Sequence, residues 1–83
     1  MLLQVSWLRH LHRNPIPQVL GVNNLTNVKD ERLRALRNEE DVFVLRIQHT
    51  RPSDRGKYEC QASSDKQGQE PLFRVITLKV VGE

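Results

Sequence analysis

The chain has 83 residues and a formal net charge of +3, with 28% charged and 37% hydrophobic residues. This length allows at most one domain, and the mild, interleaved charge with only one Trp, one Tyr and two Phe argues against a surface that stacks nucleic-acid bases. No segment approaches the roughly 18 consecutive apolar residues of a membrane span.

The first predicted element is a half-buried strand over residues 4–9. Successive side chains of a strand point to opposite faces. Val5 and Trp7 would therefore face the interior, while Ser6 and Leu8 would face outward.

Two short elements are predicted to follow a loop over residues 10–17, which carries two helix- and strand-breaking prolines. Residues 18–22 are apolar and predict a second strand, in which Gly21 indicates a bend or bulge. Residues 23–27 predict a polar turn or a very short strand.

Residues 28–37 are ambiguous. Their composition favours a short helix, with good helix formers, acidic residues first and basic residues last. Their place between two predicted strands favours a strand instead. We predict the strand, because tertiary context can override local propensity.

Three further strands are predicted, over residues 42–47, 57–63 and 72–81, with a polar hairpin loop over 64–71. The chain is therefore predicted to be all-β. Alternation places one set of apolar side chains on the core face: Phe43, Leu45, Ile47, Ile76, Leu78 and Val80.

The most informative motif spans residues 54–60 and follows the pattern D-x-G-x-Y-x-C. Asp54 and Gly56 are turn residues, and Tyr58 and Cys60 then share one face of a strand. A Tyr two residues before a Cys, with Trp7 far upstream, is typical of the corner of an immunoglobulin sandwich.

The order of motifs along the whole chain points to a narrower family. It resembles the first, V-type immunoglobulin domain of the Dpr (defective proboscis extension response) proteins of arthropods, whose relatives include the Dpr-interacting proteins and lachesin-like neural adhesion molecules. The segments that carry the resemblance are V-S-W-L-R (5–9), Q-V-L-G-V (18–22), D-E-R-L (30–33), V-L-R-I (44–47) and P-S-D-R-G-K-Y-E-C-Q (52–61). The resemblance implies a V-type β-sandwich in which the predicted strands are strands C to G.

The resemblance also implies that Cys60 pairs with a cysteine located before Trp7, but Cys60 is the only cysteine of the chain. The apolar opening is shorter than the roughly 7–15 residues of a signal-peptide core. We therefore expect residues 1–83 to be a single partial domain that is N-terminally truncated, with strands A and B missing and the secretion signal lying in the missing part.

The resemblance assigns structural roles to five residues. Trp7 and Tyr58 would belong to the core and the corner, beside the turn residue Gly56. Arg32 and Asp54 match the positions whose side chains form an ion pair under the sandwich. If that pair is partly buried, losing one partner is more harmful than losing an exposed pair.

Function is expected on the outward face of the larger sheet, because an apolar patch rimmed by polar groups suits a protein–protein interface. In the family this face pairs with another immunoglobulin-superfamily protein, which implies extracellular, cell-surface recognition between neurons. The residues expected there are Leu8, Leu20, Val22, Gln61, Ser63, Phe73 and Val75. Asn24 begins an N-L-T sequon and is the expected glycosylation site.

An alternative from another class is a secreted immune or glycan-binding immunoglobulin protein that uses the basic loop from Arg9 to Arg13. His10 and His12 in that loop lack a third ligand and are weak evidence for zinc. The sequence shows no catalytic triad order, phosphate loop or metal cluster. It therefore predicts no enzyme activity, no cofactor and no small-molecule substrate.

Overall fold

The computed structural model describes residues 3–40, 42–64 and 68–81, and these confirm the all-β prediction. A 3-10 turn, η1 (Pro52–Asp54), precedes the sixth strand. The strands are β1 (Leu3–His10), β2 (Gln18–Val22), β3 (Leu25–Thr26), β4 (Leu33–Arg37), β5 (Phe43–Ile47), β6 (Gly56–Ser64) and β7 (Leu72–Leu78).

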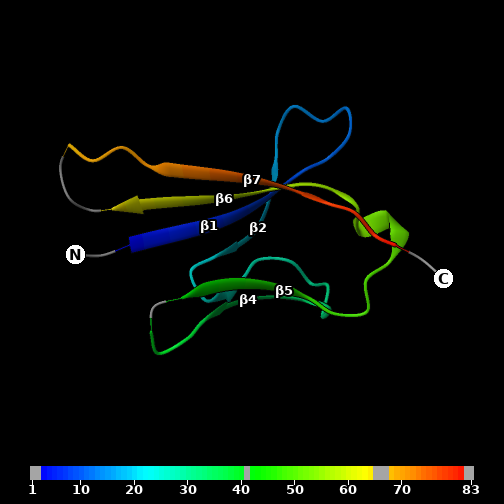
Figure 1. Ribbon diagram of the computed structural model, residues 1–83, viewed down its shortest axis with the longest axis horizontal. Helices are drawn as coiled ribbons and strands as arrows, with labels where there is room; N and C mark the ends of the chain where they lie inside the picture. Colours follow the sequence, from blue (N-terminus) through cyan, green and yellow to red (C-terminus); the bar gives the residue numbers. More distant parts are fainter. Residues whose placement is uncertain (1–2, 41, 65–67, 82–83) are drawn as a thin grey trace.

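The strands form two sheets that lie one above the other (Figure 1). The larger sheet has the order β3-β2-β1-β6-β7, and the smaller sheet pairs β4 with β5. Neighbouring strands are antiparallel throughout. β1 and β6 form the centre of the larger sheet, so residues far apart in the sequence, such as Trp7 and Cys60, lie opposite each other.

The ambiguous segment contains a strand and no helix, as predicted from its place in the chain. β4 pairs in register with β5, from Leu33 opposite Ile47 to Arg37 opposite Phe43. Leu33 and Ala35 are buried while the residues between and after them are exposed. This alternation allows one face of the strand to pack on the larger sheet, which outweighs the helix-forming composition.

A β-bulge lies where β1 pairs with β2. The register runs from Trp7 opposite Gly21 directly to Leu8 opposite Val19, so Leu20 is the extra residue. A bulge changes which side chains face each side of a strand. Leu20 consequently points inward and is only 2% exposed. The prediction that Leu20 belongs to the outward face is wrong for this reason.

Gly21 follows the bulge at the point where β2 approaches the smaller sheet. A Cβ atom placed on Gly21 would lie 2.8 Å from the Cβ of Ala35 and 2.9 Å from the carbonyl oxygen of Leu25. The backbone amide of Ala35 also donates a hydrogen bond of 3.1 Å to the hydroxyl oxygen of Thr26. Gly21 therefore allows β2 to approach β4 closely, and the Thr26 hydroxyl links the two sheets at this edge.

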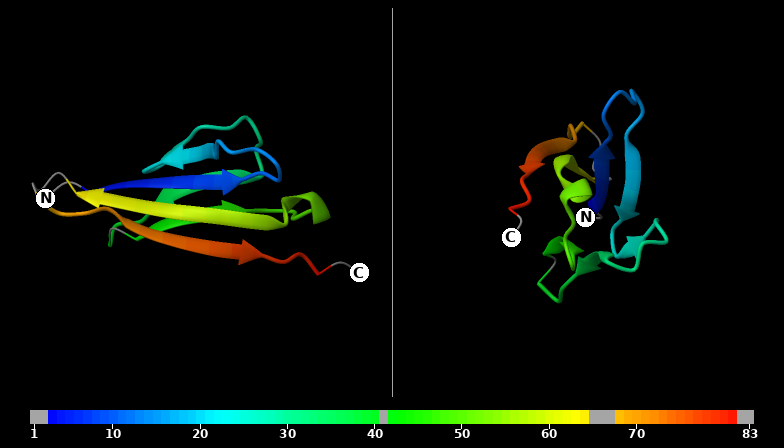
Figure 2. Two further views of the ribbon diagram at one scale, coloured as in Figure 1. Left: turned by 90° about the horizontal axis from the view of Figure 1, so that it is seen from above. Right: turned by 90° about the vertical axis from the view of Figure 1, so that its right-hand side faces the viewer.

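The core lies between the sheets and centres on Leu20, Leu33 and Tyr58. An apolar cavity of about 310 Å³ lies beside it. Ile76 faces this cavity in register with Tyr58, yet it is 53% exposed. Figure 2 shows β7 at the edge of the larger sheet, away from β4. The described part of the smaller sheet therefore covers the inner face of the larger one incompletely.

Candidate functional site: the outer face of the larger sheet

The corner that the sequence motif predicts is formed by hydrogen bonds around Asp54. The Tyr58 hydroxyl donates to the backbone carbonyl of Asp54. The Asp54 carboxylate accepts from Arg32 twice, at 2.8 Å from Nη1 and 3.0 Å from Nη2, and from the Arg51 amide at 2.7 Å. Arg32 also donates to Asp30 at 2.9 Å. The predicted ion pair of Arg32 and Asp54 is therefore present.

Electrostatics keep this corner ionised at neutral pH. The hydrogen bonds from Arg32 are the main cause that lowers the pKa of Asp54 to about 2, against an opposing effect of burial. Hydrogen bonds to Asp54 and then to Asp30 raise the pKa of Arg32. Burial raises the pKa of Tyr58. These groups position β6 and have a structural role.

Gly56 begins β6 directly after the corner and has a φ of +136°. L-amino acids rarely adopt this backbone conformation, whereas glycine does so at no steric cost. The turn residue predicted at this position thus has a clear reason to be glycine. The turn sets the direction in which β6 runs past β1.

Pairing across the larger sheet aligns two rows of side chains on its outer face. One row runs through Val22, Ser6, Gln61 and Phe73. The other runs through Val19, Leu8, Glu59 and Val75. We call these eight residues the outer face. Phe73 and Val75 are 51% and 59% exposed, whereas Leu8 is buried.

A carboxylate lies in the middle of the outer face. Glu59 accepts a hydrogen bond of 2.7 Å from Gln61 and contacts His10 at 2.8 Å. The side chain of Glu59 is only 12% exposed. The hydrogen bonds from Gln61 and then from His10 lower its pKa. The outer face therefore combines apolar edges with a negative, partly desolvated centre.

Most of the residues predicted for the outward face do lie there. Five belong to the two rows, namely Leu8, Val22, Gln61, Phe73 and Val75. Ser63 lies one row further along, opposite Gln4, and is exposed. Leu20 is the exception because of the bulge. The sequence reasoning missed Val19, which is 38% exposed and takes the place expected for Leu20. The indication of a bulge at Gly21 was the one signal that could have found it.

The remaining predicted residues are also accounted for in the described ranges. Cys60 has a free thiol on the inner side of β6, and burial raises its pKa. Asn24 is exposed in the turn between β2 and β3. Within residues 3–40, 42–64 and 68–81, no helix is long and apolar enough to span a bilayer. The same ranges contain no group of three or more metal-ligating side chains.

The basic loop divides into side chains with different surroundings. Arg9 donates to the carbonyl of Ser53 and lies over the Tyr58 ring, 5.5 Å from its centroid. It therefore supports the corner. Arg13 is exposed and has no partner among the residues that the structure describes.

Comparison with known proteins agrees with this architecture. The family model of the immunoglobulin V-set domain matches residues 1–81. The crystal structure of Dpr1 IG1 bound to DIP-eta IG1 contains a similar chain, with a TM-score of 0.73 and 26% sequence identity over 95% of this chain and 68% of that one. No curated protein matches the chain. The two-sheet topology, the Tyr58 corner and the family match together show that the chain belongs to the immunoglobulin V-set family and is a V-type domain similar to those of the Dpr proteins.

Proposed function

We propose that the chain is a recognition module that binds another immunoglobulin-superfamily protein through the outer face. The observation that carries the proposal is the pair of aligned rows on the larger sheet, in which exposed apolar side chains flank a central carboxylate. Exposed apolar side chains that a partner buries supply affinity, and the polar groups between them supply selectivity.

A solved relative supports the class of partner. The similar structure is of Dpr1 IG1 bound to DIP-eta IG1, in which two domains called IG1 are bound to each other. By similarity, we propose an immunoglobulin domain as the partner of this chain. The site would be extracellular, on the surface of a neuron, and binding between unlike proteins on neighbouring cells would contribute to the choice of synaptic partners.

The central carboxylate makes the proposed recognition selective. Glu59 is held by Gln61 and His10, so its charge stays on the outer face when a partner covers it. A partner that offers a hydrogen-bond donor opposite Glu59 would compensate the lost water. A partner with an apolar or acidic group there would leave a buried charge unpaired, which opposes binding strongly.

The test replaces one exposed side chain on each sheet. Phe73→Asp introduces a charge into the outer face, whereas Leu36→Asp changes a residue 37% exposed on the smaller sheet. Binding is measured by surface plasmon resonance against a panel of V-type immunoglobulin domains. An aromatic side chain that a partner buries as a hot spot contributes about 2 kcal/mol or more, so Phe73→Asp should weaken binding by about thirtyfold or more.

Leu36→Asp should leave the affinity unchanged, and circular dichroism should show that both variants fold. The proposal is refuted if no domain of the panel binds the native chain. It is equally refuted if both substitutions weaken binding alike, because the outer face would then have no special role.

A further inference from the structure

We propose that the chain has a second binding site, for a sulfated polysaccharide, at the end of the sandwich where residues 9–13 meet residues 53–57. These segments form a pocket of about 820 Å³. The pocket is lined by Arg9, His10, Leu11, His12, Arg13, Ser53, Arg55, Gly56 and Lys57. The inference rests on the proposed function only in placing the chain outside the cell, where such polysaccharides occur.

The first argument is the concentration of charge. Of the 13 Lys and Arg residues in the chain, four line this pocket, whereas none of the Asp and Glu residues within 3–40, 42–64 and 68–81 does. The rest of the chain therefore carries nine basic and ten acidic residues, a slight negative excess. The basic character of the protein is thus confined to this pocket, where it attracts anions.

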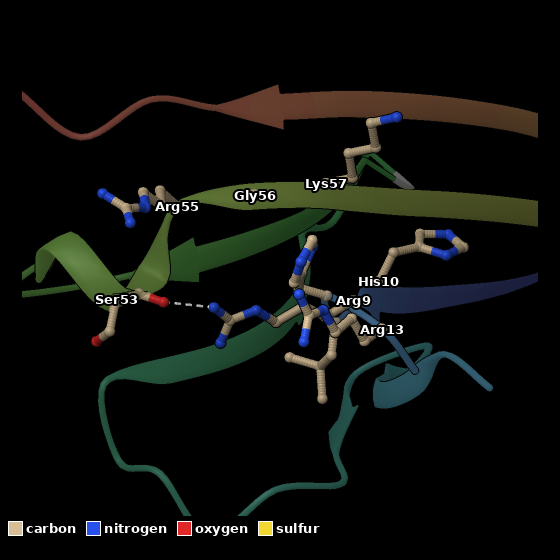
Figure 3. A pocket seen from close by; sticks show the side chains of 9 residues that line it. Arg9, His10, Arg13, Ser53, Arg55, Gly56 and Lys57 are labelled. Carbon is tan, nitrogen blue, oxygen red and sulfur yellow. Dashed lines mark hydrogen bonds between the residues drawn. The ribbon is translucent and has the colours of Figure 1, made fainter. Parts of the chain in front are cut away.

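The second argument is that several of these cations are available. Arg13, Arg55 and Lys57 are exposed, and within the described ranges none of their side chains has an ion-pair or hydrogen-bond partner. Figure 3 shows Arg9, His10 and Arg13 grouped together, with Arg55 and Lys57 projecting from the neighbouring segment. The bond from Arg9 to the Ser53 carbonyl joins the two sides and fixes their spacing.

The third argument concerns the kind of anion. Four permanent charges that arise from two separate segments exceed what a single phosphate or carboxylate neutralises. A ligand with several anionic groups along a chain fits them better. Three of the four cations are arginines, whose planar guanidinium groups bind oxyanions through two parallel hydrogen bonds.

The lining also distinguishes among polyanions. It contains no Trp, Tyr or Phe side chain of the kind that forms stacking platforms for nucleic-acid bases. Leu11 is its only large apolar residue, which is little to insert into a bilayer. A sulfated polysaccharide needs neither feature, because it binds through its sulfate and carboxylate groups.

The experiment measures binding of the full chain to a size-defined heparin oligosaccharide by isothermal titration over a series of salt concentrations. With about four ionic contacts, affinity should fall about a hundredfold between about 50 and 200 mM salt. The pocket variant carries Arg13→Ala, Arg55→Ala and Lys57→Ala. It should lose at least about tenfold in affinity near 150 mM salt and about three units of the salt slope.

The control variant removes the same charge elsewhere, through Lys29→Ala, Arg34→Ala and Arg46→Ala, which are exposed positions outside the pocket. It should bind heparin within about twofold of the native chain. Equal losses in the two triple variants would overturn the site, since they would show a response to net charge alone.

Other anionic ligands test which kind of anionic group the pocket binds. Chemically desulfated heparin should bind at least about tenfold more weakly than heparin, and polyglutamate and phosphatidylserine vesicles should not bind through the pocket. Undiminished binding of desulfated heparin, or vesicle binding that the pocket variant abolishes, would refute a sulfated ligand.

The two proposed sites can be tested independently of each other. Phe73→Asp should abolish binding of the immunoglobulin partner and leave heparin binding intact, whereas the pocket variant should do the reverse. Loss of heparin binding in Phe73→Asp would refute a separate polysaccharide site. Absence of any immunoglobulin partner would refute the proposed function and would leave the heparin measurement valid on its own.

Discussion

Neutralising the corner carboxylate with Asp54→Asn should destabilise the chain and alter its response to acid. The pKa of Asp54 is about 2 in the folded chain, compared with an ordinary value of 3.8. The difference corresponds to about 2 kcal/mol in favour of the folded, ionised state. Because the side chain is only 5% exposed, solvent screens little of this energy.

The direction of the pH effect follows from the lowered pKa. The stabilisation of the folded state by ionised Asp54 is complete above the pKa that this carboxyl has in the unfolded chain, near pH 4. It is lost as the pH falls through about 2. Asp54→Asn should therefore cost about 2 kcal/mol at pH 7 and should flatten the loss of stability between about pH 4 and 2. A smaller acid dependence should remain, since Asp30 and Glu59 also have lowered pKa values.

Urea unfolding followed by Trp7 fluorescence at several pH values measures both effects. Glu31→Gln is the matched control, because Glu31 is an exposed neighbour of Arg32. It should change stability by less than about 0.5 kcal/mol. The reasoning fails if Asp54→Asn is as stable as the control at pH 7, or if it loses stability in acid as steeply as the native chain.

Three further predictions concern single residues. Gly21→Ala should destabilise the chain by about 1–3 kcal/mol in urea unfolding, because its Cβ would meet the Cβ of Ala35 at 2.8 Å; an unchanged midpoint would contradict this. Cys60 should react with iodoacetamide more slowly in the folded chain than in urea, because burial raises its pKa; equal rates would disprove it. Chain secreted from eukaryotic cells should carry a glycan at Asn24 that mass spectrometry detects and Asn24→Gln removes; an unmodified Asn24 would count against the sequon.

Local motifs predicted the features that depend on neighbouring residues. The D-x-G-x-Y-x-C pattern contains the turn, the tyrosine hydrogen bond and the start of β6 within seven residues. A short apolar run likewise predicted the boundaries of β2, and alternation predicted the inward face of β5. The strand at residues 33–37 required knowledge of its neighbours, because the pairing with β5 outweighs its composition.

Features that depend on register or on distant segments could not be predicted in the same way. Assigning Leu20 to the outward face failed because one extra residue reverses the alternation. Only one side of the pocket could be predicted from the sequence, namely the basic loop. The proximity of this loop to Arg55 and Lys57 follows from the pairing of β1 with β6. Sequence reasoning finds the cationic segments, and the sheet topology brings them together.

The bulge in β2 also determines how substitutions along this strand should be tolerated. On each side of it, positions alternate between the core and the open surface, but the alternation changes phase at Leu20. A deletion of Leu20 would restore a regular strand, would keep Val19 opposite Leu8 and would remove a buried side chain from the core. The length of β2 is consequently as important to this protein as its composition, because a strand shortened by the bulge residue would lose a core side chain even with the other strands unchanged.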